Sequence, residues 1–196
     1  MKNFLSISFF LLLGFVGFSQ KMTNWDLDAS HSNVRFSVDH MVVSEMDGNF
    51  KKFNGQISTS KVDLTDAKID FSIDVNSINT DNEMRDKHLK GDDFFNAEKY
   101  PNMTFKSASF KKLSGNKYVL EGDLTIRDVT KRVKFDVTYG GTMKDPYGNT
   151  KAGFKAKTTI NRKNFNLQWS ATTEAGGLVV GDDVEINLNL EFAQKS

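Results

Sequence analysis

Apolar and polar residues alternate through most of the chain after residue 20, and this period of two restricts the fold to one built from β-strands. The clearest run lies near the C-terminus, where Val184, Ile186, Leu188, Leu190 and Phe192 alternate with polar residues. Because successive side chains of a strand point to opposite faces, such a run predicts a strand with one buried and one solvated face. The same pattern predicts strands over residues 34–40, 69–75, 118–126 and 133–139, and further strands near residues 45–59, 103–112 and 150–161.

Short turn sequences separate these strands. Examples are Ser114-Gly115-Asn116, Asp145-Pro146-Tyr147-Gly148 and Gly181-Asp182-Asp183, which contain residues favoured in tight turns. Connections this short leave no room for crossover helices, so neighbouring strands are expected to run antiparallel. About eight strands result, and a sheet of that size tends to close because closure removes its exposed edges. We therefore expect an all-β fold, an eight-stranded antiparallel barrel, with a sandwich as the alternative.

The segment 80–95 interrupts the alternation. It starts with a capping residue and acidic residues, and Met84 is spaced from His88 and Leu89 at helical intervals. We interpret it as a short helix that closes one end of the barrel. Within one helical turn it gathers Arg85, His88 and further charged residues, which form either a polar gate around a ligand head group or a solvated helix face.

The first twenty residues differ from the rest of the chain. One cation, Lys2, precedes an uncharged apolar run over residues 4–18, which is shorter than the ~20 residues that a membrane-spanning helix needs. This pattern is typical of a secretory signal peptide over residues 1–19, with cleavage expected near Ser19-Gln20. A retained N-terminal anchor is the alternative. After cleavage, residues 20–196 are expected to form one domain of a periplasmic or secreted protein.

The charge balance argues against some classes of function. The chain has 26 basic and 25 acidic side chains, and one of the basic ones, Lys2, lies in the predicted leader. A mature chain without net charge lacks the excess of positive charge by which proteins bind nucleic acid. The sequence has no cysteine, so it offers neither a disulfide nor a thiolate for catalysis or metal binding. Stability must therefore come from a packed core.

Three histidines, His31, His40 and His88, are the candidates for acid–base chemistry near neutral pH. Their spacing matches no metal-binding motif, and no GxSxG sequence is present. We therefore predict no metal, no cofactor and no enzymatic activity. The alternative is an enzyme, such as a hydrolase, that acts on a lipid through His88 paired with Asp86 or with His40.

The interior of such a barrel is either filled or hollow. Phenylalanines are frequent in and beside the predicted strands, where they form an ordinary core or line a pocket. An eight-stranded barrel is just wide enough to be filled by side chains or to hold one small ligand, so the periodicity leaves both interpretations open. A filled barrel would suit a protein that binds other envelope proteins.

Several ordered motifs between residues 24 and 192 resemble the YceI-like family of exported, lipocalin-like barrels associated with binding polyisoprenoid or other long-tailed lipids. In chain order these motifs are Trp25-Asp26-Leu27-Asp28, His31-Ser32, Phe36-Ser37-Val38-Asp39-His40-Met41, Gly48-Asn49-Phe50, Phe53-Asn54-Gly55, Ser77-Ile78-Asn79-Thr80, Arg85-Asp86-Lys87-His88-Leu89, Asp93-Phe94-Phe95, Tyr100-Pro101, Thr104-Phe105, Gly122-Asp123-Leu124-Thr125-Ile126-Arg127-Asp128-Val129-Thr130 and Arg162-Lys163-Asn164-Phe165. Their order over nearly the whole mature chain is far more specific than any single motif.

The sequence departs from the family pattern at two positions, because Asp128 and Asn166 stand where glycine is usual. Both positions are expected in tight turns. Since aspartate and asparagine tolerate a positive φ better than other non-glycine residues, the departures are not expected to disturb the fold.

The resemblance implies an extended apolar tunnel that holds a lipid tail, with the head group near the mouth. We expect a protein that carries or sequesters a polyisoprenoid or a similar long-chain lipid, such as an isoprenoid quinone. Transient membrane contact and a homodimer stay open. The residues expected to face the tunnel are Phe36, Val38, Phe71, Phe105, Leu124, Phe135 and Leu188, and those expected near its mouth are His40, Arg85, His88, Phe94 and Phe95. Leu89 is also expected to bind the ligand.

Overall fold

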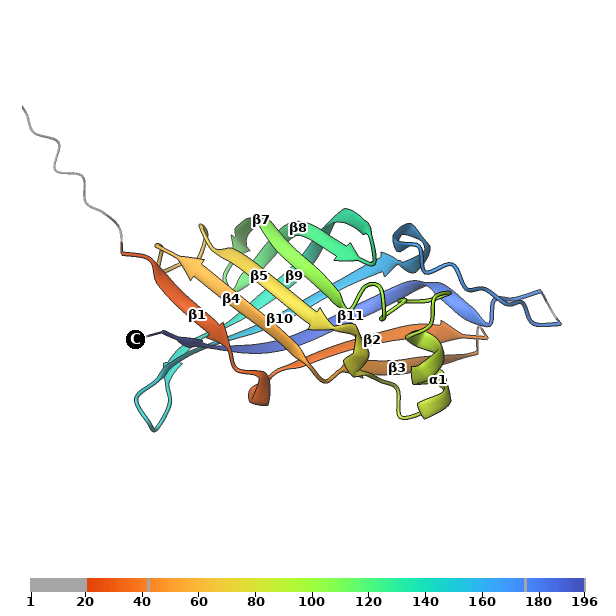
Figure 1. Cartoon of the computed structure of the whole chain (residues 1–196). Helices are drawn as coiled ribbons and strands as arrows, with labels where there is room; N and C mark the ends of the chain where they lie inside the picture. The colour runs from red at the N-terminus through yellow and green to blue at the C-terminus, as the bar shows by residue number, and fades with distance from the viewer. Residues whose placement is uncertain (1–20, 42, 175, 196) are drawn as a thin grey trace, which may run out of the picture.

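The computed structural model describes residues 21–41, 43–174 and 176–195, which form mainly β-strands (Figure 1). The predicted signal peptide lies outside these described residues. In chain order the elements are β1 (Thr23–Leu27), η1 (Ala29–His31), β2 (Asn33–His40), β3 (Ser44–Phe50), β4 (Phe53–Thr59), β5 (Lys68–Asp74), η2 (Val75–Ser77), β6 (Ile78–Asn79), α1 (Glu83–Leu89), β7 (Asn102–Ser114), β8 (Lys117–Ile126), β9 (Val129–Lys144), β10 (Thr150–Asn161), η3 (Arg162–Phe165) and β11 (Val180–Gln194). Among the described residues, no helix combines the length and the apolarity that a membrane crossing requires.

Eight strands close into an antiparallel barrel, which confirms the expected fold. Three of the eight barrel strands are interrupted, and each of these consists of two shorter strands. They are β1 with β2, which η1 separates, β3 with β4, and β5 with β6, which η2 separates. The other five are β7, β8, β9, β10 and β11. The long β11 closes the ring by pairing with β1 toward its C-terminal end and with β2 over its N-terminal part (Figure 1).

Burial follows the alternation of the sequence. In β8 every second residue from Tyr118 to Ile126 is buried, and the residues between them are half-buried. The buried apolar residues form one cluster inside the barrel. The period of two therefore decides which side chains form the core.

The expected strand near residues 45–59 is two strands, β3 and β4. Lys51 and Lys52 separate them, and their backbone N–H groups donate to the carbonyl and hydroxyl oxygens of Ser77 at 3.1 and 3.0 Å. These bonds replace the ladder bonds that a continuous strand would make. The turn expected at Gly181-Asp182-Asp183 is also absent, because these residues lie within β11, where the register with β2 shifts between Val180 and Val184.

The two departures from glycine lie in turns, as expected, but only one of them has a positive φ. Asn166 follows η3 with φ 62°. At the β8–β9 turn the left-handed residue is Arg127, with φ 55°, and Asp128 is not left-handed. Asp128 therefore lies in the expected tight turn without a positive φ, because the two-residue connection after Ile126 has its positive φ at the first position.

The short helix is present, but it is shorter than the segment 80–95. Asn82 caps α1, and its side-chain oxygen accepts a hydrogen bond from the backbone N–H of Arg85 at 3.0 Å. Thr80 lies before the helix, where its backbone N–H and its hydroxyl both donate to Asp86 at 2.9 and 2.6 Å. The helix ends at Leu89, and the residues after it form turns that return the chain to β7.

Candidate functional site

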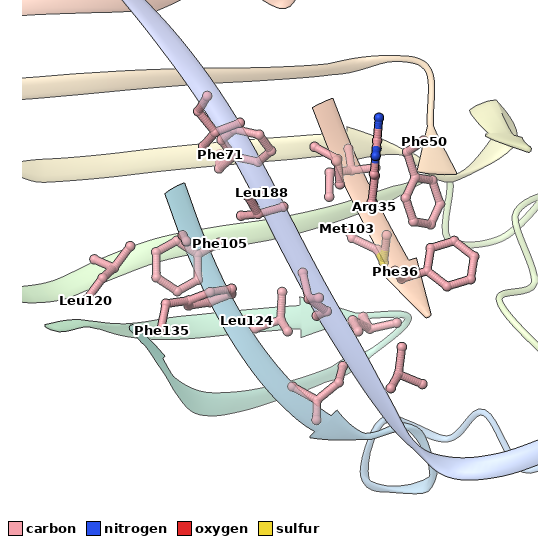
Figure 2. A pocket seen from close by; sticks show the side chains of 18 of the residues that line it. Arg35, Phe36, Phe50, Phe71, Met103, Phe105, Leu120, Leu124, Phe135 and Leu188 are labelled. Carbon is pink, nitrogen blue, oxygen red and sulfur yellow. The ribbon is translucent and has the colours of Figure 1, made fainter. Parts of the chain in front are cut away.

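A cavity of about 190 Å³ lies inside the barrel. Figure 2 shows aromatic and aliphatic side chains that project into this space from several strands. Side chains from β2 to β5 and from β7 to β11 contribute to the lining, and the surface they present to the cavity is apolar. The cavity is therefore suited to apolar groups and offers no hydrogen bonds to a polar one.

All seven residues that are expected to face the tunnel line the cavity. They are Phe36, Val38, Phe71, Phe105, Leu124, Phe135 and Leu188. Phe105 packs edge-to-face on Phe135 with ring centroids 5.5 Å apart, and the ring of Phe71 is parallel to that of Phe53 at 6.1 Å. Contact of these residues with a ligand stays a prediction.

The segment that follows α1 covers one end of the cavity. Phe94 and Phe95 line it together with Leu89, the last residue of α1, and a place of these residues at a mouth stays a prediction. Phe95 packs edge-to-face on Phe50 at 6.0 Å, and Phe50 in turn lies 5.6 Å from Phe36. A continuous row of rings thus joins this segment to the wall of the barrel.

Arg127 fastens this segment to the loop after η3. Its Nη1 donates to the carbonyl oxygen of Phe94 at 2.8 Å and to that of Asn166 at 2.7 Å. The guanidinium carbon also lies 5.6 Å from the ring centroid of Tyr100. One side chain in the β8–β9 turn therefore joins two loops that are far apart in sequence.

Trp169 completes the same end of the barrel. Its ring stacks on Phe94 at 5.4 Å, and its backbone N–H donates to the carbonyl oxygen of Asp93 at 3.3 Å. The His88 ring packs edge-to-face on both Phe94 and Trp169, at 5.0 and 5.3 Å, and its Nε2 lies 2.8 Å from an oxygen of Asp93.

Three residues expected near the mouth do not line the cavity. Arg85 is held by Thr80, with its Nε donating to the hydroxyl oxygen at 2.8 Å and its Nη2 to the carbonyl oxygen at 2.7 Å. His88 is exposed and pairs with Asp93 rather than with Asp86, whose carboxylate accepts from Thr80. His40 ends β2 opposite Val180, which does line the cavity. A role for these three in binding a head group stays a prediction.

Arg162 is a buried arginine at the edge of the cavity, with 3% of its surface exposed. Its N–H groups donate to the carbonyl oxygens of Gly181, Leu167, Trp169 and Val180 and to the carboxylate of Asp182, at 2.7 to 3.3 Å. Burial lowers the pKa of this guanidinium, and the Asp182 carboxylate opposes that effect. Since five N–H groups already have acceptors, Arg162 holds the loop after η3 against β11 and is not free for an anionic ligand.

The other charged residue at the cavity is Arg35, which is exposed. Figure 2 shows its nitrogen atoms directed away from the ring of Phe36. No histidine, serine or carboxylate among the described residues belongs to the lining. The cavity itself therefore offers no nucleophile and no acid–base group.

A polar cluster of Asp28, His31, Lys151 and Glu191 lies apart from the cavity lining. The Lys151 ammonium is 2.6 Å from Asp28 and 3.2 Å from Glu191, and His31 Nδ1 is 3.0 Å from Asp28. The lysine holds the pKa of Asp28 well below its usual range, and the carboxylates raise the pKa of Lys151. Ligand atoms of Asp28, His31 and Glu191 lie close enough together to bind a metal ion. The Lys151 ammonium, however, already pairs with the carboxylate oxygens of Asp28 and Glu191.

Sequence reasoning missed Arg127, Arg162 and Trp169 as residues of this site. The two arginines stand within motifs that resemble the family, yet no strand pattern assigns them a role. Trp169 lies in an irregular loop, where no periodicity indicates a face.

An eight-stranded antiparallel barrel around an apolar cavity defines the lipocalin-like class of β-barrels. The family model described as the YceI-like domain matches residues 25–192. The chain belongs to the YceI-like family.

Relatives and solved structures agree with this assignment. UPF0312 proteins of Staphylococcus aureus (strain N315) and Staphylococcus epidermidis (strain RP62A) are 36% and 37% identical over 173 residues, which cover 88% of this chain and 98% of theirs. BcnA of Burkholderia cenocepacia is 27% identical with a TM-score of 0.70, covering 84% of this chain and 98% of its own. The Campylobacter jejuni YceI protein is 34% identical with a TM-score of 0.69, covering 81% and 90%. A polyisoprenoid binding domain from Saccharophagus degradans, 18% identical with a TM-score of 0.64 over 87% and 98%, shares the fold.

Proposed function

We propose that this protein is an exported binding protein that carries or sequesters a polyisoprenoid or a similar long-chain lipid, such as an isoprenoid quinone, inside its barrel. The observation that carries the proposal is the apolar cavity, whose lining extends through the barrel and presents no polar surface. Each methylene removed from water contributes about 0.8 kcal/mol, so such a cavity can hold a long tail without specific polar contacts.

The likeness to other barrels supports a lipid as the ligand. The Saccharophagus degradans domain, which has the same fold, is described as polyisoprenoid binding. Family membership makes the same class of ligand the first candidate here. Head-group recognition would fall to polar groups at the end covered by α1, such as the exposed His88 and the half-buried Arg85.

The size of the cavity indicates that binding changes it. About 190 Å³ is below the roughly 300–1,000 Å³ of typical small-molecule pockets. Phe36, Phe71 and Leu188 line the space and are only half-buried. We expect aliphatic side chains of the lining, such as that of Leu188, to change rotamer and widen the cavity when a lipid enters.

Export is part of the proposal and rests on the leader sequence. An apolar run after Lys2 precedes the barrel domain. A periplasmic or secreted carrier would take its lipid from a membrane and release it to another, in transient contact with each.

Native mass spectrometry of the mature protein, purified without detergent, tests the proposal. We expect one apolar ligand at near-stoichiometric occupancy, with a mass that fits an isoprenoid or a quinone after organic extraction. Phe71→Asn should reduce the occupancy, because it places a polar group in the cavity, whereas Ser72→Asn on the opposite face of β5 should not. A folded protein that is empty and takes up none of the offered isoprenoid lipids would contradict the proposal.

A further inference from the structure

Three glycines of the barrel wall are each covered by a phenylalanine ring. A Cβ atom built on Gly48 would lie 2.2 Å from Cζ of Phe36, and one on Gly55 would lie 2.6 Å from Cδ2 of Phe71. A Cβ atom on Gly122 would lie 2.3 Å from Cζ of Phe105. Contacts this short are sterically forbidden, so each ring occupies the space that any other residue would fill.

The strand register explains why each ring reaches a glycine. Phe36 faces Gly48 directly across β2 and β3, and Phe71 faces Gly55 across β5 and β4. Phe105 faces Leu124, and Gly122 is the diagonal neighbour on the same face of β8. Side chains at these positions point into the barrel, since all three phenylalanines line the cavity. A ring that covers the glycine lies along the wall instead of across the interior.

The cavity that these rings border extends along the barrel. Leu64 lines it from the β4–β5 loop and Leu167 from the loop after η3. The β4–β5 loop contacts the start of β8, where the Tyr118 hydroxyl donates to the carbonyl oxygen of Asp63 at 3.1 Å. The loop after η3 contacts the turn at the end of β8, where Arg127 donates to the carbonyl oxygen of Asn166. The 10 residues of β8 span roughly 33 Å. A cavity of about 190 Å³ that extends over such a length has a narrow cross-section.

We propose that Gly48, Gly55 and Gly122 set the bore of the cavity by holding Phe36, Phe71 and Phe105 against the wall, and that the cavity therefore selects a flexible, extended apolar chain over a rigid, compact molecule. The proposal rests on the proposed function and adds the shape of the ligand and the residues that select it. It gives a physical role to the glycines of three motifs in which the chain resembles its family.

Gly48→Ala is the sharpest test of the bore. The atoms nearest to the added methyl are Cζ, Cε1 and Cε2 of Phe36, the far end of a side chain that can rotate. The ring must leave the wall and enter the cavity. Gly122→Ala is less informative, because its methyl would also lie 2.4 Å from the backbone oxygen of Lys106.

Two further variants complete the design. Gly153→Ala is the matched control, because its added Cβ has no atom within 4 Å and its φ is not positive. The double variant Gly48→Ala with Phe36→Leu should restore binding, since leucine lacks the three ring atoms that clash. A far-UV circular dichroism spectrum of Gly48→Ala separates a blocked bore from a failure of this variant to fold.

The probes are linear all-trans prenols of increasing chain length and a sterol, offered to the lipid-free mature protein and followed by native mass spectrometry. The parent protein should bind the longer prenols and exclude the sterol. Gly48→Ala should bind the longer prenols at least about tenfold more weakly, as expected when roughly two methylenes stay in water. Gly153→Ala should match the parent. Equal prenol binding by folded Gly48→Ala, or sterol binding by the parent as tight as prenol binding, would overturn the inference.

Xenon in crystals of the parent protein and of Gly48→Ala provides a readout that needs no lipid. Xenon enters dry apolar cavities, so its occupancy near Phe36 should fall in the variant as the ring moves inward. An unmoved ring with unchanged xenon would refute the bore mechanism. If the parent binds no prenol while xenon behaves as expected, the proposed function fails and the bore mechanism stands.

Discussion

At the scale of single residues, polar side chains stabilise the barrel around its apolar cavity. Arg162 and Arg127 bond mainly to backbone carbonyl oxygens and hold loops together. Asp28 and Lys151 bring η1 and β10 together through a short ion pair that is largely shielded from water. Since charge-assisted hydrogen bonds of this kind are stronger than neutral ones, these few residues contribute more to stability than the exposed ion pairs.

Asp28→Asn is expected to lower the free energy of unfolding at pH 7 by about 1–3 kcal/mol, because it removes a charge-assisted bond to Lys151. The pKa of Asp28 in the folded protein lies well below the usual aspartate value of about 3.9. The contribution is therefore present above about pH 4 and is lost as the pH falls further, because the unfolded chain then binds more protons. Urea unfolding at pH 7 and at about pH 3 should show a difference between parent and variant that shrinks in acid.

Asp26→Asn serves as the control for this experiment. Asp26 also pairs with a lysine, Lys195, at 3.0 Å, but both side chains are about half exposed. Its loss should change stability by less than about 1 kcal/mol. An Asp28→Asn effect that does not vary with pH would show that the ion pair is not its cause.

At the scale of elements, one end of the barrel depends on connections between loops rather than on strand pairing. The segment after α1, the β8–β9 turn and the loop after η3 meet through Arg127, Phe94 and Trp169. A helix of seven residues is too short to be stable by itself, so its position depends on these contacts. Opening of this end would therefore require Arg127 to release its two carbonyl oxygens.

Arg127→Ala is expected to lower the free energy of unfolding by about 1–3 kcal/mol, since it leaves the carbonyl oxygens of Phe94 and Asn166 without this donor. Alanine keeps the Cβ atom, so the backbone cost of the positive φ is unchanged. Hydrogen exchange by mass spectrometry should show faster exchange in residues 90–97 and 162–169. Arg132→Ala, which removes an exposed pair with Asp123, should leave this exchange as it is. Unchanged exchange in Arg127→Ala would mean that the aromatic contacts alone hold the end closed.

At the scale of the whole molecule, closure of the sheet leaves an interior shielded from water. Because β11 pairs with both β1 and β2, the ring has no free edge along most of its length. The barrel starts at Thr23, a few residues after the predicted cleavage position. Removal of the leader would therefore leave intact every strand that the structure describes in residues 21–195.

The leader prediction is tested by the mass of the protein recovered from a bacterium that expresses the full chain. We expect a mature form that begins at Gln20 in the extracytoplasmic fraction. A chain that lacks residues 2–19 should fold and stay in the cytoplasm, because it keeps all strands and loses only the export signal. Recovery of the full chain with Met1 in the membrane fraction would instead support the N-terminal anchor.

The sequence by itself determined the class of fold and the inward face of most strands. Alternation places Phe36, Phe105 and Leu188 on the apolar face, and in a closed sheet that face has to be the interior. Short connections determined the antiparallel order. These properties are local, so they can be predicted from neighbouring residues.

The tertiary structure decided whether the barrel is hollow and what closes its end. The space left inside depends on how rings from different strands pack, as Phe36 does on Gly48, and no local pattern contains that information. Arg127, Arg162 and Trp169 act through residues far away in the chain and lie outside the alternating segments. Their roles follow only from the closed barrel, because closure is what brings the distant loops together.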